Sequence, residues 1–322
     1  MSRLLSSRLL PLFATALVLL VLFAGAGWHY EHFFSARVVL NLFKDRAFLG
    51  VIALGMTFVI VSGGIDLSVG SVMACSTVLL ATLIMGMGWP VPLAMLVTLG
   101  FGAAFGGAQG WIIQAYRIPA FLVTLAGLFL ARGLAFMLSP RSLEIRHAVY
   151  TDIGARGLPL GDGLTFTLGP IVFVAVLAAA IAVAHGTRFG RTVYALGGSE
   201  SSAALMGLPV GRTRIAVYAL CGAGAALGGI LSTVALGSGD PTRGTGLELD
   251  AIAAAVIGGT VLSGGRGWMV GTFLGVLILG TIKTILDFEG SLDPAWLRIA
   301  SGGLLLGFIL LQKLIAIRAR DI

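Results

Sequence analysis

The chain has 322 residues, of which 57% are hydrophobic and only 11% are charged, and its mean hydropathy is +1.01. Soluble domains contain about 25% charged and 45–50% apolar residues, so this composition excludes a water-soluble fold. The net charge of +7 comes from 21 basic and 14 acidic residues scattered over short loops. Because these residues form no continuous basic face, we expect no nucleic-acid partner.

Apolar runs predict an all-α integral membrane protein with about ten transmembrane helices, within a range of eight to ten. A helix needs about 20 apolar residues to cross a bilayer. The runs lie at residues 9–27, 47–62, 69–87, 91–113, 118–138, 165–185, 214–236, 249–263, 268–286 and 296–316. The second and eighth runs are short, and glycine is frequent at 62–70 and 263–267, so we expect some helices to be short, broken or re-entrant.

Glycine, at 47 residues, is about twice as frequent as in ordinary proteins. Small residues four positions apart allow helix backbones to approach closely. This spacing occurs at Gly102, Gly106 and Gly110, at Gly267, Gly271 and Gly275, and in the pairs Gly224 with Gly228 and Gly303 with Gly307. The pattern predicts a tightly packed bundle or a dimer face.

The distribution of Lys and Arg predicts that the N- and C-termini are both cytoplasmic. Cytoplasmic loops retain positive charge, and an odd number of spans would place the basic C-terminus outside. Residues 1–322 then form a single transmembrane domain, with an outer loop at 139–164 and a cytoplasmic loop at 186–213. Neither loop is long enough to hold a catalytic domain.

A polar stretch, SGGIDLSVGS at residues 62–71, separates the second and third apolar runs. A carboxylate at membrane depth costs roughly 2.5–3.5 kcal/mol, so Asp66 is expected to be buried in protein, to face water or to be functional. Transporters place substrate contacts at broken helices of this kind. The alternative, favoured by the expected span limits, is that Asp66 lies near the inner surface and caps the following helix.

A second stretch, SGGRGWMVGT at residues 263–272, resembles the first when Ser263 is aligned with Ser62. Internal repeats are common in transporters. Because glycine is so abundant in this chain, chance agreement remains the alternative.

The cytoplasmic loop predicts a short helix. Ser199 is a suitable N-cap, Glu200 suits the first turn, and Gly207 followed by Pro209 would end the helix. The apolar side chains of Ala203, Leu205, Met206 and Leu208 need cover. A partner protein and the membrane surface are equally compatible with this pattern.

The sequence contains no phosphate-binding Gly-Lys-Ser/Thr motif. The lysines are Lys44, Lys283 and Lys313, and none follows a glycine. His29 and His32 are three residues apart but have no third ligand nearby, so we expect no metal site. We therefore expect a chain that is not an enzyme and binds no cofactor of its own.

Residues 59–71 resemble a signature of the ribose/xylose/galactose-type permease subunits of bacterial ABC importers. Residues 246–253, 256–260 and 263–265 are similar to that family's second signature, and the resemblance extends over essentially the whole chain. Finer features at 118–121, 187–190, 205–207 and 287–290 resemble most closely a permease of the galactofuranose importer. The family's usual Asn-Glu-Ala-Ala is here Ser-Glu-Ser-Ser at 199–202.

The resemblance implies a permease that moves a monosaccharide, most similar to galactofuranose, across the bacterial inner membrane. Its partners would be membrane lipid, a second homologous permease chain in a heterodimer, a cytoplasmic ATP-binding subunit that holds ATP and magnesium, and a periplasmic sugar-binding protein. The loops 139–164 and 237–248 would face that sugar-binding protein.

Two sets of candidate site residues follow, the first implied by the resemblance and the second by the glycine-rich breaks. The ATPase-coupling set is Ser199, Glu200, Ser201, Ser202, Leu205, Met206, Gly207 and Leu208. The translocation or broken-helix set is Ser62, Gly63, Gly64, Asp66, Ser68, Ser71, Gly258, Gly259, Ser263 and Gly264. An ion-coupled secondary transporter or channel, with Asp66 as its titrating group, is the alternative.

Overall fold

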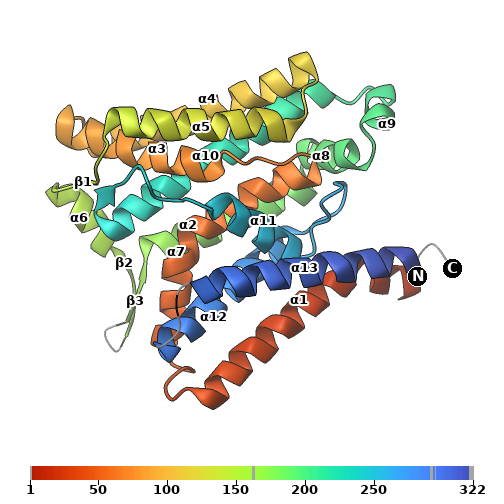
Figure 1. The fold of residues 1–322 in the computed structure, drawn as a ribbon, viewed down its shortest axis with the longest axis horizontal. Coiled ribbons are helices and arrows are strands. Elements are labelled where there is room, and N and C mark those ends of the chain that lie inside the picture. Colours follow the sequence, from red (N-terminus) through yellow and green to blue (C-terminus); the bar gives the residue numbers. More distant parts are fainter. Residues whose placement is uncertain (1, 162–163, 291–292, 294, 319–322) are drawn as a thin grey trace.

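The computed structural model describes residues 2–161, 164–290, 293 and 295–318. The helices are α1 Ser2–His29, α2 Ala36–Val61, α3 Val69–Ala81, η1 Thr82–Gly86, α4 Val91–Tyr116, α5 Ala120–Leu138, α6 Ala148–Ala155, α7 Leu168–Ile181, η2 Ala182–Gly186, α8 Arg188–Gly198, α9 Glu200–Leu205, α10 Val210–Leu236, α11 Leu247–Ile257, α12 Met269–Glu289 and α13 Ala295–Arg318. The strands are β1 Leu143–Glu144, β2 Gly157–Gly161, β3 Leu164–Thr167 and β4 Ser238–Gly239. The predicted helical membrane fold is confirmed, with two short hairpin-like strand pairs added at one end (Figure 1).

Each of the ten apolar runs falls on a helix, but within the described part of the chain only seven segments are long and apolar enough to cross a membrane. They are Pro11–His29, Val69–Gly86, Val91–Tyr116, Ala120–Leu138, Leu168–Gly186, Val210–Leu236 and Met269–Glu289. The helix α2 carries charged residues in its first half, and α11 has only 11 residues. The count of ten spans is therefore not confirmed by the described residues.

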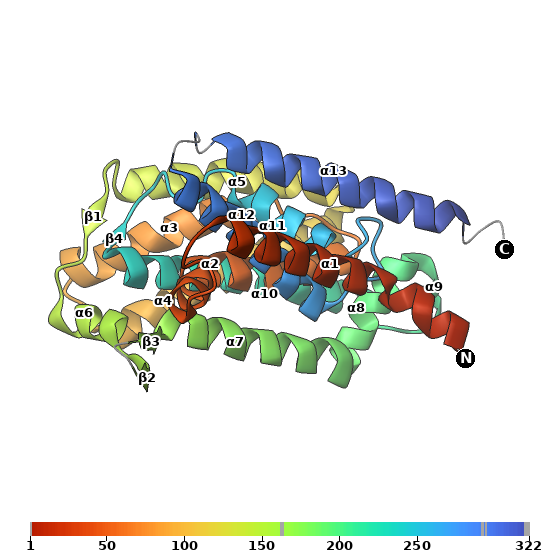
Figure 2. The ribbon, with the colours of Figure 1, turned by 90° about the horizontal axis from the view of Figure 1, so that it is seen from below.

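The two ends of the bundle differ in what they carry. The N-terminal end of α1, the C-terminal end of α13 and the helices α8 and α9 lie at one end (Figure 2). The helix α6 and the strands lie at the opposite end. We call the end with α8 and α9 the loop-helix end, and the other the strand end.

The core is built around α2. Every residue of α2 from Leu49 to Val61 is buried, and α7, α10, α11 and α12 all pack against this helix. Because a helix that is apolar on all sides must be enclosed by other elements, α2 has no face left for lipid over this stretch.

The segment before α11 explains why that helix is short. Residues 240–246 lie beside α3 without forming a helix, and Gly239 and Gly244 contact it closely. A Cβ at Gly239 would lie 2.3 Å from the Thr77 carbonyl oxygen. Arg132 of α5 donates hydrogen bonds to the carbonyl oxygens of Pro241 (2.6 Å) and Arg243 (2.9 Å), which supplies partners for this non-helical backbone.

Glycines allow close contact between helices α4 and α10. A Cβ at Gly102 would lie 2.4 Å from the Gly222 carbonyl oxygen, and one at Gly106 would lie 2.1 Å from that of Tyr218. The predicted packing role is confirmed here. It does not extend to Gly303 and Gly307, which have open space around them within this chain.

We predict that Gly106→Ala destabilises the protein by roughly 1–3 kcal/mol, because the added methyl group overlaps the backbone of α10. Gly100→Ala, on the same helix with nothing within 4 Å, is the control. Alanine favours a helix by about 1 kcal/mol over glycine, so this control is expected to be neutral or stabilising. Thermal unfolding in detergent measures both, and equal midpoints for the two variants would contradict the prediction.

Candidate functional site

The first helix break is formed by a glycine cap. The helix α2 ends at Val61, and Gly63 has a φ of +86°, which glycine adopts without strain. The Gly63 N–H donates to the Ile60 carbonyl oxygen (2.9 Å) and the Gly64 N–H to that of Val59 (3.0 Å). Ser62 Oγ also donates to the Val59 carbonyl oxygen (2.7 Å), so the last carbonyl groups of α2 have partners.

Asp66 lies inside the bundle, between this break and α3. Its side chain is 1% exposed, and Oδ1 accepts hydrogen bonds from the Ser68 N–H (2.8 Å) and Ser68 Oγ (2.7 Å). Gln109 Nε2 of α4 donates to Ser68 Oγ (3.0 Å). Asp66 therefore binds the N-cap residue of α3, Ser68, rather than capping the helix itself, and it is buried in protein as one of the sequence expectations has it.

The second break repeats the same cap with a different alignment. The helix α11 ends at Ile257, and Gly259 has a φ of +90°. The Gly259 N–H donates to the Val256 carbonyl oxygen (2.9 Å), and the next N–H donates to that of Ala255 (3.0 Å). By its cap Gly63 is equivalent to Gly259, whereas the predicted alignment of Ser62 with Ser263 matches Gly63 with Gly264, which also has a positive φ, and matches the starts of α3 and α12 to within one residue. Residues 261–266 form an added turn, in which Gly264 has a φ of +85°.

The two breaks meet each other and the end of α8 through backbone alone. The Gly265 N–H donates to the Val61 carbonyl oxygen (2.8 Å). A Cβ at Gly197 would lie 1.7 Å from that same oxygen, and a Cβ at Gly264 would lie 2.9 Å from Gly63 Cα. We call this meeting point the glycine junction, made of Gly63, Gly197, Gly264 and Gly265. Sequence reasoning missed Gly197, although the pair Gly197-Gly198 at the end of a polar helix was its signal.

The short helix α9 has the ends predicted for it. Ser199 Oγ accepts the Ser202 N–H (3.3 Å), and Gly207, with a φ of +75°, ends the helix. Ala203 is fully buried against Leu196 and Val210 of the same chain.

The apolar side chains of Leu205 and Met206 are covered by nothing in the described residues. They are 90% and 67% exposed, respectively. Two large apolar side chains at the tip of a short helix form a patch suited to a partner.

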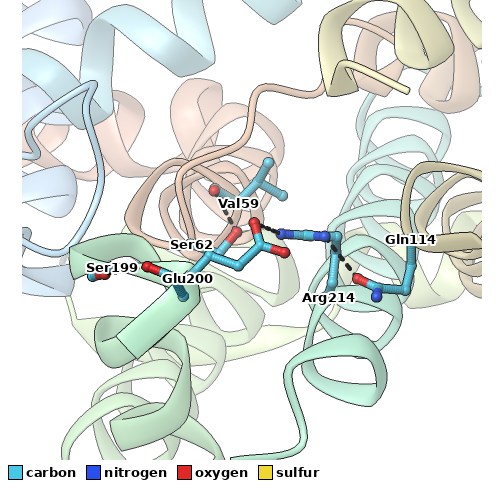
Figure 3. Close-up of polar contacts among 7 residues, drawn as sticks. Val59, Ser62, Gln114, Ser199, Glu200 and Arg214 are labelled. Atoms are coloured by element: carbon cyan, nitrogen blue, oxygen red, sulfur yellow. Dashed lines mark hydrogen bonds and ion pairs between the residues drawn. The ribbon is translucent and has the colours of Figure 1, made fainter. Parts of the chain in front are cut away.

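Glu200 ties α9 to two long helices. Its carboxylate forms an ion pair with Arg214 of α10 (2.5 Å), and Arg214 donates to Gln114 Oε1 of α4 (2.7 Å; Figure 3). The Arg214 side chain is 15% exposed but that of Glu200 is 55% exposed, so the pair is only partly shielded from water.

An open cavity of about 390 Å³ lies between these parts. Its walls come from the first break, from the connection between α4 and α5, from the α8–α9 loop and from α10. The hydrogen-bonding side chains that line it are Ser62, Arg117, Glu200, Arg214 and Tyr218. Helix break, coupling loop and cavity are therefore one continuous site at the loop-helix end.

The strand end joins the two expected outer loops into one surface. Strand β1 pairs with β4, with Leu143 opposite Gly239, and the Tyr150 hydroxyl bonds Thr233 Oγ1 (2.5 Å). Arg146 lies 2.7 Å from Glu144 and lowers the pKa of that exposed carboxyl group.

Among the described residues, no group of three or more His, Cys, Asp or Glu side chains could hold a metal ion. Cys75 and Cys221 are free and buried.

Comparison with known proteins agrees with the two signatures. A family model described as the permease component of branched-chain amino acid transport systems matches residues 38–310. The inner membrane ABC transporter permease protein YjfF of Escherichia coli (strain K12) is 44% identical over 95% of this chain and 92% of its own length. The ribose import permease protein RbsC of Escherichia coli (strain K12) is 39% identical over 85% of each chain. The fructose import permease protein FruG of Bifidobacterium longum (strain NCC 2705) is 35% identical over 96% of this chain and 92% of its own length.

No solved structure matches the chain significantly. The family match covers most of the sequence, and the relatives align over nearly their full lengths. The chain therefore belongs to the ABC-transporter permease family described as the permease component of branched-chain amino acid transport systems, alongside permeases for ribose and fructose.

Proposed function

We propose that this chain is a transmembrane subunit of an ATP-driven importer that moves a monosaccharide, most similar to galactofuranose, into the bacterial cytoplasm. The observation that carries the proposal is the polar cavity at the first helix break. The α8–α9 loop, which we expect to contact the ATP-binding subunit, forms part of the wall of this cavity. The family and the named sugar relatives support the sugar class. The finer sequence resemblance supports galactofuranose.

The chain is a protein of the bacterial inner membrane, since it belongs to a permease family and its described residues include several helices that are long and apolar enough to cross a membrane. An importer permease of this kind works with an ATP-binding subunit and a periplasmic binding protein. ATP and magnesium belong to that ATP-binding subunit in this proposal. A second, homologous permease chain completes the proposed heterodimer.

In the proposed mechanism, Leu205 and Met206 of α9 insert into a groove of the ATP-binding subunit. A shift of α9 then acts on α10 and α4 through the Glu200–Arg214 ion pair. It acts on both helix breaks through Gly197. ATP binding in this way alters which side of the membrane the pathway faces. Nothing in the described residues or the relatives favours the ion-coupled alternative.

We predict that replacing Glu200–Gly207 with a Gly/Ser segment of equal length uncouples ATP hydrolysis from sugar uptake while the chain still inserts. The narrower variant Leu205→Ser with Met206→Ser removes only the exposed apolar patch and is expected to act in the same way. Ala204→Ser, exposed on the same helix, is the control. The measurement is sugar uptake per ATP hydrolysed in proteoliposomes, and an unchanged ratio in the Gly/Ser variant would sink the coupling proposal.

We predict that Asp66→Asn assembles normally and retains transport, because the asparagine Oδ1 still accepts both hydrogen bonds from Ser68. Asp66→Ala loses both bonds and is expected to accumulate less folded protein. Thermal midpoints and uptake are measured for both variants. Normal assembly of Asp66→Asn with abolished transport would instead assign Asp66 a mechanistic role.

We predict that Gly197→Ala breaks communication across the glycine junction, since its methyl group overlaps the Val61 carbonyl oxygen. Gly198→Ala, at the neighbouring position with nothing within 4 Å, is the matched control. The expected result for Gly197→Ala is a lower thermal midpoint than that of Gly198→Ala and, in the complex that still assembles, ATP hydrolysis that no longer responds to the sugar-loaded binding protein. A response equal to that of Gly198→Ala contradicts this role.

A further inference from the structure

Each helix break leaves one backbone carbonyl group without a bond from its own cap. In both caps, the N–H groups of the glycine and of the next residue donate to carbonyl groups three and five positions back, so the carbonyl group of the last helical residue is left over. At the first break this residue is Val61, whose oxygen accepts the Gly265 N–H (2.8 Å). At the second break it is Ile257, which is fully buried. Because an unpaired buried carbonyl group destabilises a protein, Ile257 also needs a partner.

A side chain of the N-terminal helix supplies that partner. Thr15 Oγ1 of α1 donates to the Ile257 carbonyl oxygen (2.6 Å). The same hydroxyl lies 2.9 Å from the Pro11 carbonyl oxygen, but that group can accept a backbone N–H within α1. Pro11 touches the break as well, since a Cβ at Gly259 would lie 2.9 Å from Pro11 Cβ. One turn of α1 therefore contacts both the last carbonyl group and the capping glycine of the second break.

The rest of α1 has the character of a helix that faces lipid. From Pro11 to His29, only Thr15 and Ala26 are buried. Its large exposed side chains include Phe13, Leu17 and Leu20. Inside a membrane, threonine is typical of a contact where one helix bonds another segment. The position of this buried hydroxyl is therefore explained by its contact with the second break.

The second break is thus held on two sides. On one side Gly265 bonds Val61 at the glycine junction, where the end of α8 also arrives. On the other side Thr15 bonds Ile257, at the point where α11 ends. Without the second bond, α11 and the break can separate from α1, and a movement that enters at the glycine junction shifts the break alone.

We propose that Thr15 is a positioning residue for transport, which holds the second helix break against α1 so that movement of the α8–α9 loop is passed on to the bundle. This inference rests on the proposed function and adds α1 to the path that couples ATP hydrolysis to uptake. Thr15 acts through Ile257 and contacts no substrate in this proposal.

The test measures sugar uptake per ATP hydrolysed by the whole importer in proteoliposomes. Thr15→Val keeps the shape of the side chain without its donor and is expected to lower this ratio about fivefold, the effect of losing one hydrogen bond. Thr15→Ser keeps the hydroxyl group and is expected to retain the wild-type ratio. A wild-type ratio in Thr15→Val, or an equally low ratio in Thr15→Ser, overturns the proposal.

A matched control separates this role from stability. Thr281 is also fully buried, but its hydroxyl donates to the Leu277 carbonyl oxygen of its own helix (2.8 Å). Thr281→Val therefore loses a buried hydroxyl group without releasing the break. Its thermal midpoint is expected to equal that of Thr15→Val, and its uptake per ATP is expected to equal that of wild type. A ratio in Thr281→Val as low as that in Thr15→Val shows a loss of stability alone and overturns the proposal.

Hydrogen exchange tests the contact without the rest of the importer. In the full chain in detergent, the amide groups of residues 258–266 are expected to exchange about fivefold faster in Thr15→Val than in Thr281→Val, because the break opens more often. Equal exchange in the two variants contradicts the holding role of Thr15, even if the Thr15→Val importer does not assemble.

Failure of the proposed function looks different from failure of this inference. If the wild-type complex takes up no sugar with ATP, the importer proposal fails, whatever the exchange at the second break. If wild-type uptake is normal and Thr15→Val keeps the same uptake per ATP, only the role of Thr15 fails.

Discussion

Backbone hydrogen bonding inside the membrane is the constraint on which this structure depends. A hydrocarbon environment offers no water to an exposed N–H or C=O group, so a helix can break only where neighbouring segments supply partners. At both breaks a glycine in the left-handed region caps the helix. The Gly265 N–H then joins the second break to the last carbonyl group of α2. Because this hydrogen bond gives a partner to a backbone group of each break, the two breaks stabilise each other when they lie side by side.

The same small side chain serves two different purposes along the chain. Between α4 and α10, Gly102 and Gly106 allow long helices to touch along their backbones. At the glycine junction, Gly197 allows a loop helix to touch the ends of broken ones. The first contact packs α4 directly on the backbone of α10, and the second brings the end of α8 against both helix breaks.

The loop-helix end combines contacts of different strength around one cavity. The Glu200–Arg214 pair is partly shielded from water, while Leu205 and Met206 are open to a partner. The ion pair and the hydrogen bond from Arg214 to Gln114 connect α9, which carries the exposed patch, to α10 and α4. The cavity wall includes Glu200, Arg214 and Gly197, so residues of α8, α9 and α10 meet around the same space.

The sequence by itself determined the features that depend on neighbouring residues. Apolar runs located the helices, and Ser199 and Gly207 marked the ends of α9, because these signals act within one or two turns. The positions of the two breaks were predictable from glycine and serine for the same reason.

The tertiary structure alone decided which distant groups meet. It placed Gly197 against both breaks, buried Asp66 beneath α4 and α10, and laid residues 240–246 along α3. None of these has a local signal, because each depends on the packing of segments far apart in the chain, where a glycine has the same immediate neighbours whether it faces lipid, backbone or a cavity.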